Sequence, residues 1–412
     1  QKFQTDVTLE SLKISETGAQ LHPYQRQYSH VYAQRLAQLK PRCLDNIPND
    51  DKITVVSRIL DLREGIPCRV VGTLVKECIM NKDEPPLYPN KKTCRASDVL
   101  YLEDESGRVT LECSENKQHE WTTGMVVAVE GVVHEGGVFH VDTFFTPSMA
   151  PHMTFTTTSA EQRDKSDTTP HVLLLSGLNC AAPGVCSLAR DMLLGYLEGS
   201  LIPKSAQEES VCRVMIAGNS AAPSTDAIQE LDAWIAQLCA AGIPITLLPG
   251  QEDASTANWP QRPLHSSLFK YGGSFVDSSL LSRTPNPMAC GINDKYIIGT
   301  DGRNVMDLYQ HTNISTELEA LALLLKCGHV CPTGPSSVPT VPSGEVDVMV
   351  MEHTPHLLFA GNCSQFATDL VTCGSTKTRI VCIPKFSETG QAILVNMETL
   401  NVQVLEFDDG ME

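Results

Sequence analysis

In HVLLLSGL, at residues 171–178, the apolar run does not alternate and stops at a glycine, which makes it the main fold signal of the chain. A helical segment and a second run, VCRVMIAGN (211–219), follow it, and the pattern returns in IPITLLPGQED (243–253) and HLLFAGN (356–362). Continuous runs of Val, Ile, Leu and Met are typical of strands covered on both faces. We therefore expect an α/β domain in which four buried strands end in glycine turns, with any functional residues at those strand ends.

Size and charge limit the functions that the chain can have. Its 412 residues exceed one ordinary core, so two or more domains are expected. The formal net charge of -18 argues against a protein that grips nucleic acid on its own, because phosphate binding needs a basic surface. A local basic patch is compatible with this charge. The chain has no run of about 18 apolar residues, so we expect neither a membrane span nor a secretory signal.

Fifteen cysteines are scattered along the chain without a C-x-x-C pair, and the closest two are Cys327 and Cys331. This distribution favours reduced cysteines that act as small core residues of a cytosolic or nuclear protein. A zinc site or a disulfide framework is the alternative.

The N-terminal part predicts a frayed extension over residues 1–20 and then one amphipathic helix. From His22 onward, apolar residues recur at helical spacing until Pro41 ends the pattern. The stripe consists of Tyr24, Tyr28, Val31, Tyr32, Leu36 and Leu39. We interpret this aromatic stripe as core packing.

Between residues 53 and 146 the period changes to that of strands. Five β segments are expected, at residues 68–80, 98–104, 107–113, 125–134 and 137–145. Gly72 in the first segment predicts a bend or a bulge, and a long loop at 81–93 follows that segment. Five strands in about 90 residues fit an OB-type β-barrel.

The expected barrel is acidic rather than basic. Barrels of this type often bind single-stranded nucleic acid through aromatic stacking and a basic groove. Here the strands carry few exposed aromatics and several acidic residues, namely Glu77, Glu103, Asp104, Glu112, Glu130 and Glu135. A structural or protein-binding barrel is therefore favoured over one that binds nucleic acid.

The second half alternates strands with helices. We expect a helix at 226–241, which Asp226 can cap, and another at 315–326, with Thr316 and Glu319 at capping-box spacing. Three β segments, expected to form a terminal meander, lie at residues 378–386, 391–396 and 401–407. This order indicates a two-layered α/β sandwich.

Common catalytic motifs are missing from the sequence: it has no phosphate loop, no G-x-G-x-x-G after a strand, no H-E-x-x-H and no G-x-S-x-G. The polar candidates at strand ends are Asn219, Asp253 and Asn362, with histidines at positions 265, 329, 353 and 356. Asn after glycine is most simply a turn residue, since it tolerates left-handed backbone. We expect Asp253 to cap a turn, and His353 and His356 to lie at the surface or cap a strand start.

Nine short motifs follow one another in the order and approximate spacing of a known family. They are HPYQRQYSHVYAQRL (22–36), LEDESGRVTL (102–111), LLLSGL (173–178), VMIAGN (214–219), LLPGQED (247–253), QRPLHSSLF (261–269), IIGTDGRNVMDL (297–308), CPTGP (331–335) and LLFAGN (357–362). Together they resemble the small, B-type accessory subunits of replicative DNA polymerases, and most closely the polymerase delta type.

The resemblance implies a domain order. An N-terminal extension and helix would span residues 1–45, an OB-fold domain 46–153, a linker 154–170 and an inactive phosphoesterase-like domain 171–412. The linker is poor in apolar residues, as a connection between domains should be. The expected fold class is a five-stranded OB-type barrel followed by a two-layered, calcineurin-like phosphoesterase β-sandwich flanked by helices.

The resemblance also identifies the turns to inspect. Active calcineurin-like phosphoesterases hold two metals with ligands in the patterns D-x-H, G-D-x-x-D, G-N-H, a lone His and G-H-x-H at successive strand ends. This chain has Asn219 where a bridging Asp would lie, and Asp253 without an Asn-His pair. No catalytic residue, metal or cofactor is therefore expected. The former active-site turns contain Ser176, Gly177, Gly218, Asn219, Gly250, Asp253, Gly361 and Asn362.

By this resemblance the chain is a non-catalytic scaffold in the nucleus. Its partners would be the Cys-rich C-terminal domain of the polymerase delta catalytic subunit and the N-terminal domain of the third subunit, with the polymerase zeta catalytic subunit as a further partner. It would reach DNA only through the complex. Three alternatives stay open: an active metal-dependent phosphoesterase or nuclease, a single-strand-binding module, and the equivalent subunit of another replicative polymerase. The sequence does not identify the residues that bind each partner.

Overall fold

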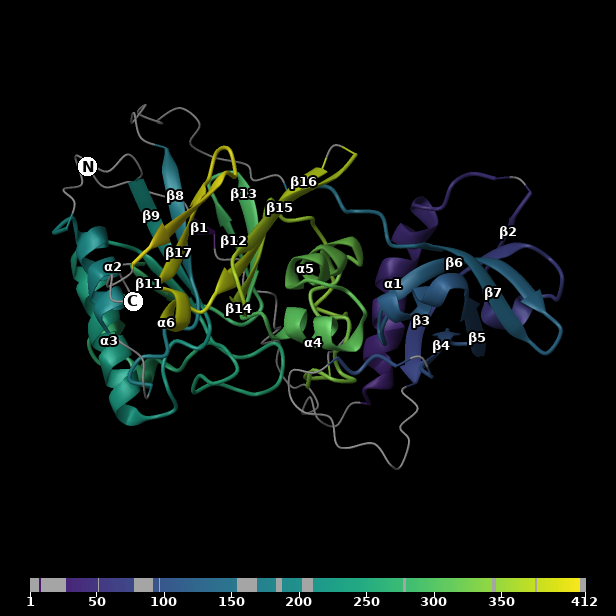
Figure 1. Ribbon diagram of the computed structural model, residues 1–412, viewed down its shortest axis with the longest axis horizontal. Coiled ribbons are helices and arrows are strands. Elements are labelled where there is room, and N and C mark those ends of the chain that lie inside the picture. The colour runs from purple at the N-terminus through teal and green to yellow at the C-terminus, as the bar shows by residue number, and fades with distance from the viewer. Residues whose placement is uncertain are drawn as a thin grey trace. The chain divides into compact units, whose positions relative to one another are not determined.

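A computed structural model of the chain is shown in Figure 1. It describes residues 7–8, 27–50, 52–77, 92–95, 97–153, 169–182, 187–201, 210–276, 279–342, 346–374 and 376–407. Most of the expected linker at 154–170, most of the loop at 81–93 and the start of the helix expected from His22 lie outside the described residues.

The chain divides into two compact units. Unit 1 consists of Gln1–Lys13, His152–Arg303 and Pro355–Glu412, and unit 2 of Ile14–Pro151 and Asn304–Thr354. The expected boundaries placed all of 171–412 in one domain, whereas here the segment Asn304–Thr354 groups with the N-terminal half. A chain segment can join the unit that offers it the better packing surface, and sequence order alone does not reveal that choice.

Unit 1 is built from two six-stranded sheets. The first has the order β11-β10-β9-β8-β17-β18, in which β8 to β11 are parallel and the last two strands antiparallel. Its strands are β8 (Pro170–Leu175), β9 (Ser210–Ala217), β10 (Ile245–Leu248), β11 (Leu281–Arg283), β17 (Gln391–Asn396) and β18 (Val402–Glu406). The second sheet, in the order β1-β12-β13-β14-β16-β15, contains β1 (Val7–Thr8), β12 (Met288–Ile292), β13 (Lys295–Thr300), β14 (Leu357–Cys363), β15 (Ala367–Cys373) and β16 (Thr376–Pro384).

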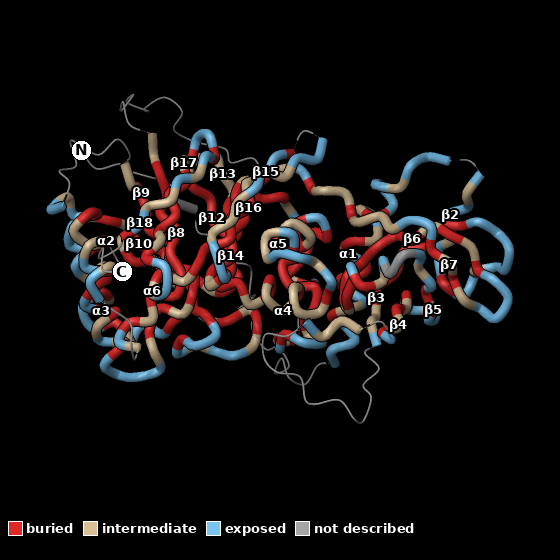
Figure 2. Tube along the Cα trace, viewed as in Figure 1, coloured by how far each residue is buried: buried red, intermediate tan, exposed pale blue. Residues whose placement is uncertain are grey.

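Alternate residues of strand β8 face two different cores, which explains its unbroken apolar sequence. Val172 and Leu174 pack with Phe359 of the second sheet. Leu173 and Leu175 belong instead to the core that includes the helices. Figure 2 shows the central strands buried along most of their length. The two-layered sandwich predicted from the apolar runs is therefore confirmed.

Helices α2 (Leu188–Glu198) and α3 (Thr225–Ala240) cover the outer face of the first sheet (Figure 1). Helix α3 lies where a helix was expected, but Asp226 is not its cap. The Ser224 side chain accepts a hydrogen bond from the Ala227 N–H at 3.2 Å. Ser224 has extended backbone, which points its hydroxyl into the first turn, while Asp226 already lies within the helix.

Two expectations about the chain ends are wrong. The three C-terminal β segments do not form one meander, because β16 pairs with β14 and β15 whereas β17 and β18 belong to the other sheet. The N-terminal extension is not unpaired throughout, since Val7 and Thr8 pair with Ile292 and Gly291. The local sequence pattern predicts that a segment is a strand, but long-range packing determines which strand it pairs with.

Unit 2 contains the OB-type barrel, and all five expected strands are confirmed. They are β3 (Cys68–Glu77), β4 (Val99–Glu103), β5 (Arg108–Cys113), β6 (Val126–His134) and β7 (Val138–Phe145). A short additional strand, β2 (Thr54–Val56), pairs with β3. Pairing of β3 with β6 closes the order β2-β3-β4-β5-β7-β6. The bulge lies between Glu130 and Gly131 rather than at Gly72. Gly72 instead permits close approach, since a Cβ there would lie 2.7 Å from Leu102 Cγ.

Helix α1 (Ser29–Asp45) packs on the barrel, and two details of the expected helix are wrong. Pro41 lies inside the helix, because Leu39 and Cys43 on either side of it are anchored in the core. Tyr28 is 44% exposed, so the aromatic stripe is not core packing at that position. The buried face includes Arg35 instead.

The segment Asn304–Thr354 contributes helix α5 (Glu317–Lys326) and most of α4 (Arg303–His311). The expected cap of α5 is confirmed: Thr316 Oγ1 accepts from the Glu319 N–H at 3.2 Å, and the Glu319 carboxylate accepts from the Ser315 N–H at 2.9 Å. Helix α4 has no counterpart among the expected helices.

One buried guanidinium joins the parts of unit 2. Arg35 is 1% exposed, and its Nε donates to Asp347 Oδ2 at 2.8 Å. Its other nitrogens donate to the carbonyls of Gly124 at 3.0 Å, Pro332 at 2.6 Å and Gly334 at 2.7 Å. A buried charge is tolerated only when it is paired and hydrogen-bonded. Arg35 therefore ties α1 to the barrel and to the segment Asn304–Thr354.

His329 completes this cluster as a neutral imidazole. Its Nδ1 accepts from the Cys331 N–H at 3.0 Å, which leaves Nε2–H to donate to Asp347 Oδ2, also at 3.0 Å. Burial lowers the pKa of His329 to about 4, an effect that Arg35 reinforces and Asp347 opposes. Burial alone would raise the pKa of Asp347, but His329 and Arg35 outweigh it and lower this pKa.

The cysteines that the structure describes form no disulfide with one another, and all except Cys94, Cys113 and Cys373 are buried. This agrees with the expected role of reduced core residues. Within the described part of the chain, no helix combines the length and the apolar composition needed to cross a membrane.

Replacing Arg35 tests its central position in unit 2. We expect Arg35→Met to lower the free energy of unfolding by about 3–5 kcal/mol, because Asp347 is left buried without its cation. Arg58→Met is the matched control, since Arg58 forms an exposed ion pair with Asp61 and its loss should leave the unfolding midpoint unchanged. Urea unfolding followed by circular dichroism measures both variants. Equal effects would contradict the role given to Arg35.

His329 makes stability depend on pH. Between its ordinary pKa of 6.5 and its folded value of about 4, the unfolded chain binds a proton that the folded chain does not. Stability is therefore lost as the pH falls through this window. We expect His329→Gln, which cannot titrate, to flatten the loss of Tm between pH 7 and pH 4.5. All other groups titrate in both proteins, so parallel Tm curves would rule out the contribution of His329.

Candidate functional site

The turns after β8, β9 and β10 are hydrogen-bonded or packed against one another and against the end of β14, where the register shifts between Ala360 and Cys363. The Gly177 N–H donates to the Gly218 carbonyl at 2.9 Å, and the Asn362 N–H donates to Ser176 Oγ at 2.9 Å. A Cβ on Gly250 would lie 2.4 Å from the Asn219 nitrogen. The structure thus brings the candidate residues of these four strand ends together. We call this group the strand-end site, and it consists of Ser176, Gly177, Gly218, Asn219, Gly250, Asp253, Gly361 and Asn362.

Ser176 links the first turn and the end of β14 to the strand β16. It is fully buried. Its Oγ accepts from the Asn362 N–H and lies within donating distance of the Pro384 carbonyl at 2.9 Å and the Ile383 carbonyl at 3.2 Å. Its own carbonyl accepts from the Phe386 N–H at 2.8 Å. The hydroxyl both donates and accepts hydrogen bonds inside the fold, so Ser176 acts as a structural bridge.

Asp253 holds the second and third turns. Its Oδ1 accepts from the N–H groups of Ser220 at 2.8 Å and Ala221 at 3.2 Å, and its Oδ2 accepts from the Gly250 N–H at 2.8 Å. Burial raises the pKa of the Asp253 carboxyl, and these backbone donors oppose that shift. The carboxylate does cap backbone groups, as a turn cap would, but it spans two turns rather than one.

Asn219 and Asn362 both lie in left-handed backbone, with φ of 50° and 52°. The Asn219 Oδ1 accepts from the Glu252 N–H at 3.1 Å. The Asn362 Nδ2 donates to the carbonyls of Ala217 at 3.1 Å and Asp301 at 3.0 Å. The two amides therefore connect neighbouring strand ends through the backbone. Asn219 lies in a turn as expected, whereas Asn362 belongs to the irregular end of β14.

Three polar residues of this region were missed from the sequence. Gln261 Nε2 donates to the Gly250 carbonyl at 3.1 Å, and its Oε1 accepts from Asn286 Nδ2 at 2.7 Å. Asn286 Oδ1 accepts from the Asp301 N–H at 3.3 Å. Burial raises the pKa of the Asp301 carboxyl to about 6, against the effect of Asn286. The signal for Asp301 was its position directly after a strand, in IIGTD; Gln261 and Asn286 follow no strand pattern.

Three of the four candidate histidines are hydrogen-bonded to other groups, whereas the buried Nδ1 of His353 has no hydrogen-bond partner. His265 Nδ1 bonds Ser267 Oγ at 2.8 Å, and His356 Nδ1 accepts from the Tyr296 N–H at 3.0 Å. His329 and His353 belong to unit 2. The hydrogen bonds found for these histidines thus do not involve the strand-end site.

The chemistry available at the strand-end site follows from these contacts. Its hydroxyl and amide groups bond backbone, and its acids, Asp253 and the adjacent Asp301, are both buried. A binuclear metal centre needs several carboxylates and imidazoles that are free to ligate. Among the described residues, the side chains that could jointly hold a metal ion lie in unit 2 instead.

Close packing at the second turn can be tested with two glycines of similar backbone. Gly218 has φ of +78°, and a Cβ there would lie 2.7 Å from both Asp301 Cβ and Gly250 Cα. Gly242 has φ of +81° but open space around it. We expect Gly242→Ala to cost about 1–2 kcal/mol from backbone strain alone, and Gly218→Ala to cost clearly more. Thermal unfolding compares the two, and equal losses would show that the turns are not tightly packed.

Two family models match the chain in the order of the observed elements. The model described as "DNA polymerase delta subunit OB-fold domain" matches residues 27–144, which include α1 and the barrel. The second model describes the B-type subunits of DNA polymerases alpha and epsilon and matches residues 172–368, which include the whole strand-end site.

Two solved structures are similar to part of the chain. Protein TT1561 of Thermus thermophilus is 14% identical, covers 58% of this chain and 100% of its own length, and has a TM-score of 0.31. A structure described as a novel archaeal phosphodiesterase is 10% identical, covers 57% of this chain and 98% of its own length, and has a TM-score of 0.30. Scores this low support no functional conclusion.

Relatives of similar length match nearly the whole chain. The DNA polymerase delta small subunit of Oryza sativa subsp. japonica is 29% identical over 94% of both chains. DNA polymerase delta subunit 2 of Drosophila melanogaster is 28% identical, again over 94% of both. The small subunit of Saccharomyces cerevisiae is 26% identical over 93% of this chain and 90% of its own. The chain belongs to the family of DNA polymerase delta small subunits.

Proposed function

We propose that this polymerase delta subunit is a non-catalytic scaffold in the nucleus. It links the Cys-rich C-terminal domain of the catalytic subunit to the N-terminal domain of the third subunit, and it serves the polymerase zeta catalytic subunit in the same way. Replication, repair and translesion synthesis then depend on it for assembly rather than for chemistry.

The observation that supports this proposal most directly is the hydrogen bonding of the Asp253 carboxylate to the backbone. Its two carboxylate oxygens accept three backbone N–H groups at 2.8, 3.2 and 2.8 Å. A metal ligand in a phosphoesterase must instead direct its lone pairs to the ions. Asn219, at the neighbouring turn, is a neutral amide whose oxygen also accepts a backbone N–H. Both residues support a turn-building role and a silent phosphoesterase site.

The barrel surface supports a protein partner rather than nucleic acid. The guanidinium of Arg108 lies 4.7 Å from the ring centroid of Tyr101 and pairs with Glu77 at 2.6 Å and with Glu103. A cation and an aromatic ring that could bind phosphate and stack a base are thus occupied by each other and by two acids. Arg69, which pairs with Glu130 at 2.6 Å, is buried and offers no cation at the surface. Such pairing removes much of the electrostatic attraction that nucleic-acid binding requires.

Reconstitution tests the linking role. When the full chain is co-expressed with the catalytic and third subunits, we expect one stable complex of all three on gel filtration at physiological salt. An interface that survives this treatment should bury roughly 1,600 Å² or more with each partner. Without the chain, we expect the third subunit to elute apart from the catalytic subunit. If those two subunits still co-elute, the chain is not the link.

The same preparation tests the rival functions. The purified chain should hydrolyse bis(p-nitrophenyl) phosphate no faster than buffer with Mn²⁺, and Asp253→Asn should leave that result unchanged. Hydrolysis that Asp253→Asn abolishes would make the chain an active phosphoesterase. Fluorescence anisotropy with labelled single-stranded DNA addresses the other rival, because binding that weakens steeply with salt would assign the barrel to nucleic acid.

A further inference from the structure

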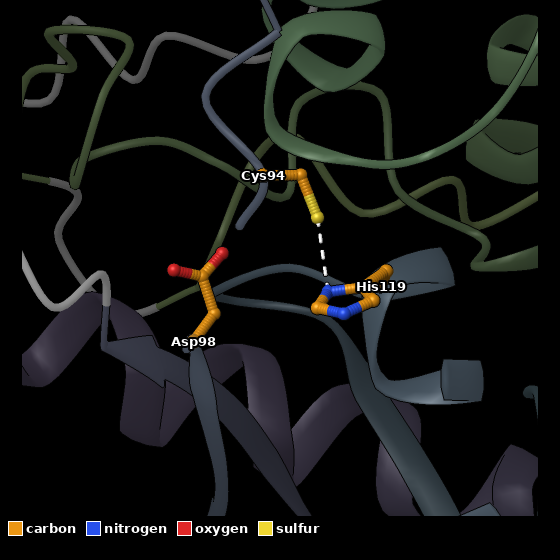
Figure 3. A group of neighbouring side chains, drawn as sticks. All are labelled: Cys94, Asp98 and His119. Atoms are coloured by element: carbon orange, nitrogen blue, oxygen red, sulfur yellow. Dashed lines mark hydrogen bonds between the residues drawn. The ribbon is translucent and has the colours of Figure 1, made fainter. Parts of the chain in front are cut away.

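Three side chains from separate places in the sequence converge in unit 2, whereas the strand-end site belongs to unit 1. Cys94 and Asp98 precede strand β4, and His119 lies in the short helix η3 (Ser114–Glu120) that follows β5. One ligand atom from each lies within 4.8 Å of those from the other two. Figure 3 shows the Cys94 sulfur directed at the His119 ring, with the Asp98 carboxylate beside them.

The donor set has the chemistry of a zinc site. Thiolate, imidazole and carboxylate are the three side-chain ligands that Zn²⁺ takes, whereas a thiolate disfavours Mg²⁺ or Ca²⁺. Cys94 Sγ and His119 Nδ1 are 3.1 Å apart. Typical Zn–S and Zn–N bonds at a tetrahedral angle place these atoms roughly 3.5 Å apart. A small outward movement of the two side chains would admit the ion.

A second observation points to a missing ligand. Asp98 is 5% exposed, and its Oδ2 accepts from the Arg95 N–H at 2.9 Å. Its other oxygen, Oδ1, is buried without a hydrogen-bond partner. An unpartnered buried carboxylate oxygen is costly and calls for an explanation such as an ion. A cation between Asp98, Cys94 and His119 supplies that partner.

The surroundings of His119 suit coordination through Nδ1. His119 Nε2 lies 3.4 Å from Gln118 Nε2, while the buried Gln118 Oε1 has no partner. The two ends of a glutamine amide are assigned by their hydrogen bonds and can be exchanged. With the amide turned over, Gln118 Oε1 accepts from Nε2–H. That tautomer leaves the Nδ1 lone pair free for the metal. A hydrogen bond from the other ring nitrogen, such as the one to Gln118, usually supports a histidine that ligates a metal.

Lys76 is the group that a metal ion would have to accommodate. Its buried ammonium lies 3.1 Å from Cys94 Sγ and 3.8 Å from Asp98 Oδ2, and it also donates to the carbonyls of His311 at 3.0 Å and Trp121 at 3.3 Å. With the ion bound, Lys76 can donate to the thiolate, yet its positive charge still opposes the ion.

We propose that Cys94, Asp98 and His119 form a zinc site, with water as the fourth ligand, that clamps the segment before β4 to helix η3. The site does not depend on the proposed scaffold function. Its ligands are spaced 4 and 21 residues apart without a paired-cysteine motif, so the sequence offered no signal for it.

Cobalt substitution tests the site in the full chain. The purified protein is stripped with chelator under reducing conditions and titrated with Co²⁺, whose absorption reports tetrahedral geometry and thiolate ligation. We expect one Co²⁺ per chain with a thiolate-to-cobalt charge-transfer band that Zn²⁺ displaces. Cys94→Ser should lose the band and His119→Ala should lose tight binding. Cys113→Ser, which changes a neighbouring cysteine outside the site, should keep both.

The variant Lys76→Met distinguishes two possibilities: that Cys94, Asp98 and His119 bind a metal ion, or that Cys94 and Asp98 only pair with the Lys76 ammonium. Removing the ammonium should tighten Co²⁺ binding by about tenfold or more, because a positive charge near the ion is lost. Zn²⁺ should also raise the Tm of the wild type and of Lys76→Met but not of Cys94→Ser. The proposal is overturned if the wild type shows no charge-transfer band, if Cys94→Ser retains it, or if Lys76→Met, still folded, no longer binds.

Discussion

A buried charged group needs hydrogen-bond or ion-pair partners, and both units contain such a group at a point where several segments meet. In unit 2 the guanidinium of Arg35 is 1% exposed, and Asp347 and three carbonyls surround it. In unit 1 the carboxylate of Asp253 is buried among three backbone N–H groups. Each group joins segments that are far apart in the sequence. The elements around each group can lie close together because its hydrogen-bond partners offset the cost of burying its charge.

The same requirement shapes the strand ends of unit 1. Sheets that end in glycine turns bring polar residues together, and in an enzyme those residues would face a substrate or a metal. Here Ser176, Asn219 and Asn362 bond the backbone of neighbouring strand ends. The glycines retain their geometric task, since a Cβ on Gly302 would lie 1.8 Å from the Gly361 carbonyl oxygen.

Much of the fold could be predicted because it rests on local periodicity. The five barrel strands and helices α3 and α5 appear where the hydrophobic patterns put them, and the Thr316 cap was visible from residue types alone. The errors share a cause. Pro41 inside α1, the exposed Tyr28 and the division of the C-terminal strands between two sheets all depend on contacts with distant segments. Periodicity records which face is apolar, and it carries no information on what will cover that face.

In the functional regions, the turn residues, their order and the family resemblance can be recognised from the sequence, because motifs are properties of neighbouring positions. What those residues contact depends on the tertiary structure. It gave Asp253 three backbone partners, placed Asp301 beside the second turn, and brought His119 to Cys94 across 24 intervening positions. Hydrogen bonding and ligation require approach to within about 3 Å, and for residues far apart in the chain that approach exists only once the sheets have packed.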